Sequence, residues 1–443
     1  MFWNELISTA RLGKSENYVA PLEGRTEFQR DYDRLIFSAA FRRMQNKTQV
    51  FPLPGSIFVH NRLTHSLEVS SVGRSLGHDV GISLTKRHGP ALANEMQSLE
   101  SITSAACLAH DMGNPPFGHS GENAIRTFFS ENEGSTLRPH FTEQQWMDIT
   151  KFDGNANTFR LLTHQFEGRR PGGFVMTYST LASVVKYPFS STLAPKSKFG
   201  FFESEQPLFE EMARKLGLLC KQRTDQGAVV YARHPLVYLV EAADDICYEV
   251  MDVEDAHKLR LLSFDETEDL LLAFFDEPER SSIRSAYAEE TDLNDRIVYY
   301  RACVINHLVR ACVQIFVENE ESILAGQFEG SLVSHLPAPL GPAFARISKL
   351  AKTKIYNCKE VTDVEIAGYH IIYTLLELMV DAVLHPEKAY SQLLLCQASK
   401  QYALQAPAIA DRIMAVLDYL SGMTDVFALD LYRKINGHSL PVV

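Results

Sequence analysis

Apolar residues recur along much of the chain at the spacing of one face of a helix. In the clearest stretch the apolar positions follow one another at intervals of three, four and four residues: Val69, Val72, Leu76 and Val80. This spacing predicts a helix through the sixties and seventies with one buried stripe. His65 lies four positions before Val69 and falls on the same stripe, so an imidazole is expected to face the interior.

Two further predicted helices carry or precede polar side chains. Small residues fill 102–109, and Pro115 and Pro116 follow soon after Gly113, so a helix is predicted to end near that glycine. Another helix is predicted from five residues at strict four-residue intervals: Leu236, Val240, Asp244, Tyr248 and Asp252. One face of this helix therefore changes from apolar to polar along its length.

The remaining pattern is mostly helical as well. A helix is predicted before Pro386 from the apolar positions Ile372, Leu375, Leu376, Met379 and Val383. Strand patterns are weak and short, at 49–51, 57–59 and 228–231. The fold is therefore predicted to be mainly α, with at most short hairpins. Residues 186–202 hold prolines, serines and lysines, which indicates an irregular loop of the kind that often covers a site.

The composition is that of a folded soluble protein. Of 443 residues, 45% are hydrophobic and 22% charged, which excludes a disordered, collagen-like or low-complexity chain. The longest apolar runs, such as 236–240, fall far short of the roughly 20 residues that a membrane-spanning helix needs. The N-terminus carries an early acid, Glu5, and no basic stretch followed by an apolar one. No secretory signal is therefore expected, and the cytoplasm is the predicted location.

The cysteines and the net charge exclude some kinds of site and partner. Seven cysteines are scattered without a C-x-x-C pair, which argues against a disulfide framework and a thiolate zinc site. The net charge of −12 disfavours a general nucleic-acid coat or an anionic membrane as the main partner, but leaves room for a local basic site. Basic residues between Arg25 and Lys47 are interleaved with Asp31 and Asp33, which indicates internal salt bridges more than nucleic-acid binding.

The dipeptide His110-Asp111 is the first candidate for chemistry, because an adjacent imidazole and carboxylate at a helix end can both reach one divalent metal. Such a pair alone is weak evidence, since His78-Asp79 is a second one in ordinary sequence. The context separates the two: a Gly- and Pro-rich turn follows His110-Asp111 and ends in another histidine, His119. That turn can aim side chains at a cavity.

Two other positions could complete such a site. His65 and Arg62 share one helical face, and Asp244 lies in the middle of a helix that otherwise looks buried. A buried unpaired carboxylate is costly, so a metal or an ion-pair partner is expected for Asp244. Taken singly, His65 is also compatible with a core histidine bonded to a carbonyl, and Asp244 with a salt bridge to an arginine.

The order of His65, His110-Asp111 and Asp244 resembles the H…HD…D signature of the HD superfamily of metal-dependent phosphohydrolases. The surrounding blocks resemble, more specifically, the bacterial deoxyguanosine triphosphate triphosphohydrolase family. They are FRRMQNKTQV (41–50), NRLTHSLEV (61–69), GNPPFGH (113–119), DGNAN (153–157), SVVKYP (183–188), ADDICY (243–248) and GMTD (422–425). These blocks cover nearly the whole chain.

The resemblance implies hydrolysis of a deoxynucleoside triphosphate, with dGTP as the first candidate, to a deoxynucleoside and inorganic triphosphate. It implies a divalent cation (Mn, Mg, Co or Fe) held by His65, His110, Asp111 and Asp244, and mixed imidazole and carboxylate ligands suit these metals. It places a catalytic pair at His119 and Glu122, whose i, i+3 spacing lets the carboxylate fix the imidazole tautomer. The positions it assigns to substrate binding are Gln49, Arg62, Asn155, Lys186, Tyr187, Tyr248, Asp252 and Arg433.

The expected organisation is an N-terminal segment (1–58) packed on an HD core (59–255), with a helical C-terminal region (256–443) that continues the core. The resemblance further implies a homo-oligomer, in the family often a hexamer, and a possible nucleotide or single-stranded DNA effector. Beyond its first member, the acidic stretch Asp252, Glu254 and Asp255 is expected to be a solvated helix end.

Two rival functions remain open from the sequence. One is another HD-type nucleotidase or phosphodiesterase that uses the same metal site, and its reaction products would differ. The other is a non-enzymatic nucleotide or single-stranded nucleic-acid binding regulator. His119 and Glu122 argue against the second rival, because a pure binder needs no acid and base.

Overall fold

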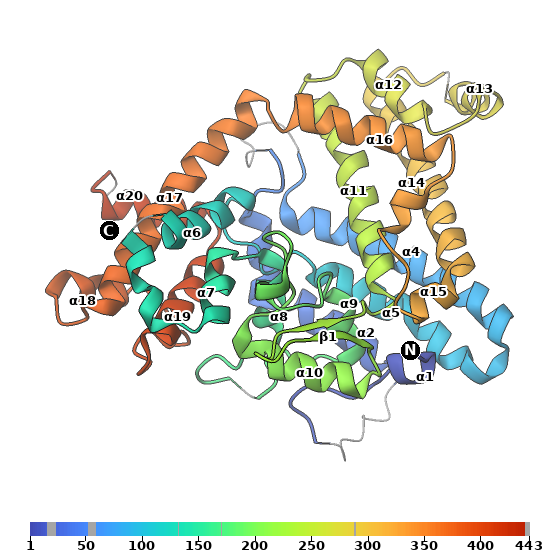
Figure 1. Cartoon of the computed structure of the whole chain (residues 1–443). Coiled ribbons are helices and arrows are strands. Elements are labelled where there is room, and N and C mark those ends of the chain that lie inside the picture. The colour runs from blue at the N-terminus through green and yellow to red at the C-terminus, as the bar shows by residue number, and fades with distance from the viewer. Residues whose placement is uncertain (16–23, 52–58, 132, 170, 288, 439–443) are drawn as a thin grey trace.

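The computed structural model describes residues 1–15, 24–51, 59–131, 133–169, 171–287 and 289–438, and the description below refers to these residues. Helices dominate them (Figure 1), which confirms the predicted mainly α fold. The first part of the chain contains α1 (Trp3–Leu6), α2 (Glu27–Ile36), α3 (Ala39–Arg43), η1 (Met44–Asn46), α4 (Arg62–His88), η2 (Pro90–Leu92) and α5 (Ala93–Ala109).

The middle of the chain adds α6 (His119–Glu131), η3 (Glu133–His140), α7 (Glu143–Thr150), α8 (Gly154–Thr163), α9 (Tyr178–Val184), η4 (Ser191–Leu193), η5 (Glu203–Glu205), α10 (Gln206–Lys215) and α11 (Val237–Lys258). The C-terminal part consists of α12 (Phe264–Leu272), α13 (Glu277–Ala286), α14 (Leu293–Glu318), α15 (Glu320–Leu324), η6 (Leu332–His335), α16 (Leu340–Leu350), the π-helical turn η7 (Ala351–Ile355), α17 (Lys359–Leu384), α18 (Ala389–Leu395), α19 (Ile409–Ser421) and α20 (Asp425–Ile435).

Within the described residues the sheet is one antiparallel pair, β1 (Cys220–Arg223) and β2 (Val229–Tyr231), with Cys220 opposite Tyr231 and a register shift before Gln222. This hairpin confirms the strand pattern predicted at 228–231. The other predicted hairpin lies largely outside the described residues, since 52–58 are not among them. Next to it, Thr48 and Asn61 form an isolated antiparallel bridge.

The predicted apolar stripe of α4 is buried as expected. Val69, Leu76 and Val80 are all fully buried, and His65 beside them is 2% exposed. The helix begins at an Asn61 capping box, in which the Asn61 side chain accepts the backbone N–H of Thr64 and the Thr64 hydroxyl accepts that of Asn61. The cap therefore fixes where the helix starts and with it the position of His65 one turn later.

Helices α4 and α5 pack at unusually short range, which sets the distance between the two histidine-bearing segments. A Cβ at Gly77 would stand 2.8 Å from the carbonyl oxygen of Leu99, and one at Gly81 would stand 2.4 Å from that of Met96. Any side chain at these glycines would force the helices apart. The end of α5, where His110 follows, is thereby held near the start of α4.

The interior consists of two hydrophobic clusters. The first holds α4, α5, α11 and α14 together and includes residues from Trp3 to Val361. The second packs α17, α19 and α20 on α6 and α7 and includes residues from Ala124 to Leu431. Figure 1 shows the first group to the right and the second to the left, with α8, which contributes residues to both clusters, between them. The predicted division into segments 1–58, 59–255 and 256–443 stays a prediction.

Helix α17 contains the predicted apolar positions 372–383 and ends, as expected, before Pro386. It is the one described helix that is long and apolar enough to cross a bilayer, with 50% of the apolar window buried inside the molecule. Leu375, Leu376 and Met379 lie in the second hydrophobic cluster. The apolarity of α17 thus serves internal packing.

The predicted solvated end of α11 is wrong. Glu254 is 3% exposed and Asp255 2%. Glu254 forms ion pairs with Arg301 of α14 and Lys258, and Asp255 accepts hydrogen bonds from the backbone N–H of His60 and from its ring, at 2.9 and 2.8 Å. These acids are buried because α14 and the segment before α4 cover the end of α11, which the local charge pattern could not reveal.

Candidate active site

Two histidines and two carboxylates from three separate segments meet in the structure. One ligand atom of each of His65, His110 and Asp111 lies within 4.8 Å of the others, a spacing at which one cation can contact all three. The Oδ1 atom of Asp244 lies 3.1 Å from His65 Nε2 and 3.4 Å from His110 Nε2. The four residues predicted as metal ligands are therefore brought together.

His110 points a buried ring nitrogen at this cluster without a hydrogen-bond partner. Its Nδ1 lies 2.6 Å from the carbonyl oxygen of Cys107, and because a carbonyl only accepts, Nδ1 carries the proton of this bond. Its Nε2 is buried and makes no hydrogen bond within the described residues. Although burial lowers the pKa of His110, Asp111 and Asp244 raise it to about 9. The cluster thus favours a positive charge at Nε2, which a bound cation can supply instead of a proton.

Both carboxylates of the cluster are ionised. Burial works against the charge of Asp111, but Arg62 and His110 lower its pKa below the usual value. Burial likewise opposes the charge of Asp244, yet the neighbouring imidazoles hold its pKa well below the usual range. Anionic oxygens beside imidazole nitrogens, which bind a cation in place of a proton, form a donor set without a thiolate that fits Mn, Mg, Co or Fe.

The contacts of His65 and Asp244 bear on the two alternatives that the sequence leaves open, a core histidine bonded to a carbonyl and an aspartate paired with an arginine. The arginine ion pair belongs to Asp111, which contacts Arg62 Nη1, whereas Asp244 faces the imidazoles. His65 contacts the Asp244 carboxylate through Nε2. Asp111 also accepts a hydrogen bond of 2.6 Å from Asn114 Nδ2. The local surroundings therefore match a ligand cluster better than a lone core histidine and a lone salt bridge.

A cavity of about 470 Å³ opens beside the cluster, which is within the size range of small-molecule sites. His65 is buried behind it. The predicted site residues that line the cavity are Gln49, Arg62, His110, Asp111, His119, Glu122, Asn155, Lys186, Tyr187, Asp244 and Tyr248. The predicted loop at 186–202 supplies part of this wall, as expected for a loop that covers a site.

His119 and Glu122 form a polar pair at the start of α6. The side chain of His119 is 75% exposed, and its Nδ1 lies 3.0 Å from Glu122 Oε2. Glu122 is buried and accepts a further hydrogen bond of 2.7 Å from the backbone N–H of Gly154. Burial opposes the charge of Glu122, but His119, Lys198 and Arg126 lower its pKa to about 2. An ionised Glu122 can only accept, so it fixes the proton of His119 on Nδ1 and leaves Nε2 for chemistry.

Two lysines line the cavity, and each is paired with carboxylates. Lys186 Nζ lies 3.2 Å from a Glu241 oxygen, and although burial opposes its charge, Glu241 raises the pKa of Lys186. Lys198 Nζ lies 3.2 Å from an Asp153 oxygen and 3.9 Å from a Glu122 oxygen. Burial also opposes the charge of Lys198, but these two carboxylates raise its pKa. Both ammonium groups are therefore charged and line the cavity, where they can meet an anionic ligand.

The wall assigned to the sugar differs in one residue from the prediction. Gln49 and Tyr248 line the cavity, and Gln49 Oε1 is buried without a hydrogen-bond partner in the described structure. Asp252 is 6% exposed and does not line it, because the Tyr356 hydroxyl lies in front and donates to Asp252 Oδ2 at 2.7 Å. Burial raises the pKa of Asp252 well above its usual range. Tyr356 therefore lines the cavity with Asp252 bonded to its hydroxyl, and the sugar contact of Asp252 stays a prediction.

Asn155 and Arg433 occupy different places. Asn155 lines the cavity and its amide donates to Asp153 Oδ1 at 3.0 Å. Arg433 is exposed in the last turn of α20 and does not line the cavity of a single chain. A role for Arg433 at this site therefore requires a neighbouring subunit, and it stays a prediction.

The turn that carries His119 is clamped by the C-terminal part of the chain. Asp425, the first residue of α20, is 5% exposed and accepts the backbone N–H of Phe117 at 2.9 Å and that of Thr48 at 2.7 Å. Phe117 has a φ of 59°, a conformation that costs energy for a residue with a side chain. These two hydrogen bonds to Asp425, called the clamp below, explain why the GMTD block at 422–425 belongs to the same set of family-like blocks although it is far from the others in the sequence.

Four residues of this site were not assigned a role from the sequence. Lys198 stands in the loop that was expected to cover a site, so its position was signalled but its role was not. Glu241 precedes Asp244 by three positions on the same helix and could have been found by that spacing. Tyr356 follows the π-helical turn 351–355, and the Asp425 carboxylate acts through two backbone groups. No local pattern identifies the last two.

Two domain models and full-length relatives match the chain. Residues 62–147 match the HD domain model, and residues 335–434 match that of the phosphohydrolase-associated domain. A deoxyguanosinetriphosphate triphosphohydrolase-like protein of Pseudomonas aeruginosa (strain UCBPP-PA14) is 38% identical over 455 residues, which span 100% of each chain. One from Synechocystis sp. is 38% identical over 99% of this chain and 100% of its own.

A more distant relative extends the comparison. The deoxyguanosinetriphosphate triphosphohydrolase of Yersinia pestis (strain Pestoides F) is 30% identical over 92% of this chain and 93% of its own. The similarity thus runs along the full length of the chain and includes both matched domains. The chain belongs to the deoxyguanosinetriphosphate triphosphohydrolase-like family of HD-domain proteins.

Proposed function

We propose that the protein is a metal-dependent hydrolase that converts a deoxynucleoside triphosphate, with dGTP as the first candidate, to a deoxynucleoside and inorganic triphosphate. One observation carries the proposal: a single cavity holds residues of the His/Asp cluster, the His119–Glu122 pair and two charged lysines. The cluster suits a cation, the pair suits proton transfer, and the lysines suit an anion. The names of the relatives point to the same reaction.

The cluster would hold the cation through His65, His110, Asp111 and Asp244. When bound, such a cation supplies positive charge at a phosphate oxygen and makes water more acidic. Arg62 keeps Asp111 ionised, and Asn114 orients it through a hydrogen bond of 2.6 Å. These two residues therefore prepare a ligand, and Arg62, which lines the cavity, would also contact the phosphates of the substrate.

Proton transfer is assigned to His119. Water adds to the α-phosphorus, the bond to the 5′ oxygen breaks, and the deoxynucleoside leaves with a proton. His119 Nε2 either takes the proton of the attacking water or gives one to the 5′ oxygen, while Glu122 holds the ring by Nδ1. The ionised carboxylate also stabilises the imidazolium that forms when His119 acts as a base.

The rest of the cavity would bind the two ends of the substrate. Lys186 and Lys198 would face the triphosphate, which carries several negative charges. Gln49 Oε1 can accept a hydrogen bond from a sugar hydroxyl, and the Tyr248 ring can pack against the sugar. A tight fit at the sugar would exclude the 2′-hydroxyl of a ribonucleotide.

Product analysis tests the proposal. The purified protein is incubated with Mn²⁺ or Mg²⁺ and each of the four dNTPs, and triphosphate is resolved from pyrophosphate and orthophosphate. Triphosphate with free deoxynucleoside is expected, and the preferred base appears in the same experiment. Deoxynucleoside monophosphate with pyrophosphate would contradict cleavage at the 5′ oxygen. No turnover, even with mixed dNTPs present as activators, would favour another HD substrate or a regulatory binder.

We also propose that the protein works in the cytoplasm as a homo-oligomer, with a hexamer as the first candidate, and responds to a nucleotide or single-stranded DNA effector. Large apolar side chains are exposed on the C-terminal helices, among them Ile366 at 71% and Leu393 at 65%. Burying such side chains between subunits would stabilise an assembly. Size-exclusion chromatography with light scattering tests the oligomeric state, and a molar mass of one chain would contradict the homo-oligomer.

A further inference from the structure

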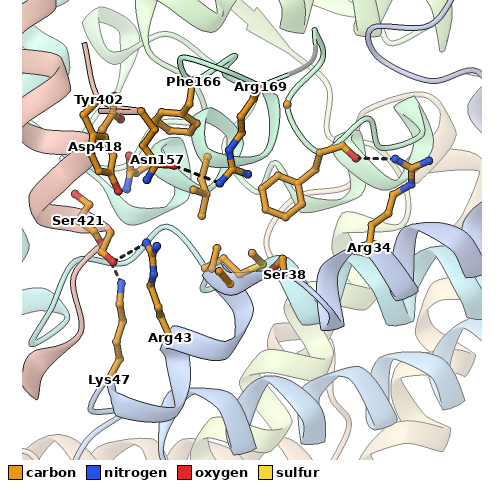
Figure 2. A pocket seen from close by; sticks show the side chains of 18 residues that line it. Arg34, Ser38, Arg43, Lys47, Asn157, Phe166, Arg169, Tyr402, Asp418 and Ser421 are labelled. Carbon is orange, nitrogen blue, oxygen red and sulfur yellow. Dashed lines mark hydrogen bonds between the residues drawn. The ribbon is translucent and has the colours of Figure 1, made fainter. Parts of the chain in front are cut away.

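The structure contains a second cavity (Figure 2). Its volume is about 290 Å³, and it shares no lining residue with the catalytic cavity. Met112, which directly follows Asp111, forms part of its wall. The remaining walls come from segments far apart in the sequence, including α2 and α3, α8, residues 166, 169, 173 and 174, and the end of α19.

Four cationic side chains line this second cavity: Arg34, whose Nη1 donates to the carbonyl oxygen of Phe174 at 3.2 Å, and then Arg43, Lys47 and Arg169. Figure 2 shows Arg43 and Lys47 extending into it from one side and Arg169 from the opposite side. Arg43 Nη1 donates to the carbonyl oxygen of Gly422 at 3.0 Å, and Lys47 Nζ donates to that of Ser421 at 2.8 Å. Arg169 Nη2 donates to Gln401 Oε1 at 3.3 Å. The acceptors found for Arg43, Lys47 and Arg169 in the described part of the chain are all neutral.

The lining also contains a carboxylate, but it does not neutralise these cations. Asp418 Oδ1 and Oδ2 accept hydrogen bonds from Arg160 Nε and Nη2, at 2.7 and 2.8 Å. Arg160 is buried behind the wall and is not part of the lining. The second cavity thus concentrates positive charge in a chain whose net charge is −12.

In the described structure a buried hydroxyl at this place lacks a hydrogen-bond partner, and a buried ammonium group donates only to neutral carbonyl oxygens. Ser421 is 4% exposed, lines the cavity, and its Oγ has no hydrogen-bond partner in the described structure. Lys47 is 3% exposed, and burial lowers the pKa of its ammonium group to about 7, with Arg62 and Arg43 adding to the effect. A negatively charged occupant would accept from Ser421 and offset the repulsion among the cations.

We propose that this second cavity binds a small phosphate-bearing ligand through Arg43, Lys47, Arg169 and the hydroxyl of Ser421. Donors that approach from opposite sides suit a tetrahedral oxyanion, whose oxygens point in several directions, better than a planar carboxylate. A volume of about 290 Å³ restricts the ligand to a small molecule. This binding step, the binding of the phosphate-bearing ligand in the second cavity, does not depend on the function proposed for the catalytic cavity.

The same contacts link the second cavity to the metal-ligand cluster. Lys47 Nζ also donates to the carbonyl oxygen of Asn114 at 2.5 Å, and Asn157 Nδ2 donates to that of Gly113 at 2.6 Å. Asn114 in turn holds Asp111 Oδ1 through its amide. A ligand that draws Lys47 toward itself therefore acts on the turn that orients Asp111. The ligand is a regulator of the site, a conclusion that rests on the proposed function.

Calorimetric titration of the full chain with pyrophosphate tests the binding step. The variants are Arg169→Gln and Arg43→Gln in the second cavity, Lys186→Gln in the catalytic cavity, and Arg74→Gln as a matched control on the exposed face of α4. Each second-cavity variant loses a charged donor, so its Kd should rise about tenfold or more. The control and Lys186→Gln should keep the wild-type Kd for this site. Arg169 is exposed, so Arg169→Gln should keep the wild-type Tm even if Arg43→Gln does not fold.

Two outcomes would overturn the binding step. If Lys186→Gln abolishes pyrophosphate binding while Arg169→Gln leaves it unchanged, pyrophosphate occupies the catalytic cavity only. If citrate binds and loses affinity in Arg169→Gln while pyrophosphate does not bind, the ligand class is carboxylate and not phosphate. The effect of the second cavity on hydrolysis is tested separately, by measuring hydrolysis rates at increasing inorganic phosphate. We expect phosphate to change the rate of the wild type and of Arg74→Gln but not that of Arg169→Gln. The same change in all three proteins would contradict this effect and leave the binding step standing.

Discussion

At the scale of single residues, His119 is the group whose chemistry is easiest to isolate. Its side chain is exposed and bonded only to Glu122 in the described structure, so His119→Ala should fold and bind substrate normally. Loss of a general acid or base should lower kcat by about 10²–10⁴ and leave KM within about threefold. His78→Ala is a matched control, because His78 is also exposed and pairs with a glutamate, Glu100, at 2.8 Å. Wild-type rates from His119→Ala would remove this residue from the mechanism.

Asp244 tests the metal site at the same scale. Asp244→Ala removes the carboxylate that contacts both imidazoles, so the affinity for Mn²⁺ should fall by at least about 100-fold. Metal content after dialysis, measured by elemental analysis, reports this without any activity assay. Asp79→Ala is the control, since Asp79 belongs to the second His-Asp pair of the chain. Normal metal content in Asp244→Ala would instead move the fourth ligand to Asp245.

At the scale of elements, α20 acts on the catalytic turn through its first residue. Asp425→Ala would leave the buried N–H groups of Phe117 and Thr48 without an acceptor. Each unsatisfied group costs about 1–3 kcal/mol, so Tm should fall and kcat should drop because the turn before His119 is no longer held. Asp430→Ala is the control on the same helix, because Asp430 is half exposed and pairs with Lys434. Equal Tm and kcat in both variants would exclude a clamp.

The helices that carry the ligands could be predicted because their signals are local. The stripe of α4, the small residues of α5 before Gly113 and the four-residue interval of α11 are properties of contiguous sequence. The role of Tyr356 could not be predicted, because its place at the cavity depends on how a π-helical turn more than 100 residues beyond Asp244 packs on α11. The burial of Glu254 escaped prediction for the same reason, since Arg301 of α14 covers it.

At the scale of the whole molecule, the site lies where the two hydrophobic clusters meet. The metal ligands come from helices of the first cluster, whereas α6, which begins with His119, packs in the second. Arg160 adds a buried connection, since it pairs with Glu205 at 2.6 Å and with Asp418 of α19 at 2.7 Å. The geometry of the site therefore depends on both clusters being folded together, and only long-range packing, not local pattern, determines it.

This dependence predicts that both clusters unfold in one cooperative transition. The two tryptophans of the chain report on them separately, because Trp3 lies in the first cluster and Trp146 packs against the second. Trp146→Phe keeps only Trp3, and Trp3→Phe keeps only Trp146. For each variant in increasing guanidinium, the midpoint of the fluorescence change should agree with the midpoint of the circular dichroism change. A separate, earlier transition at Trp146 would show that the second cluster is an independent unit, and His119 would then leave the site before the ligands do.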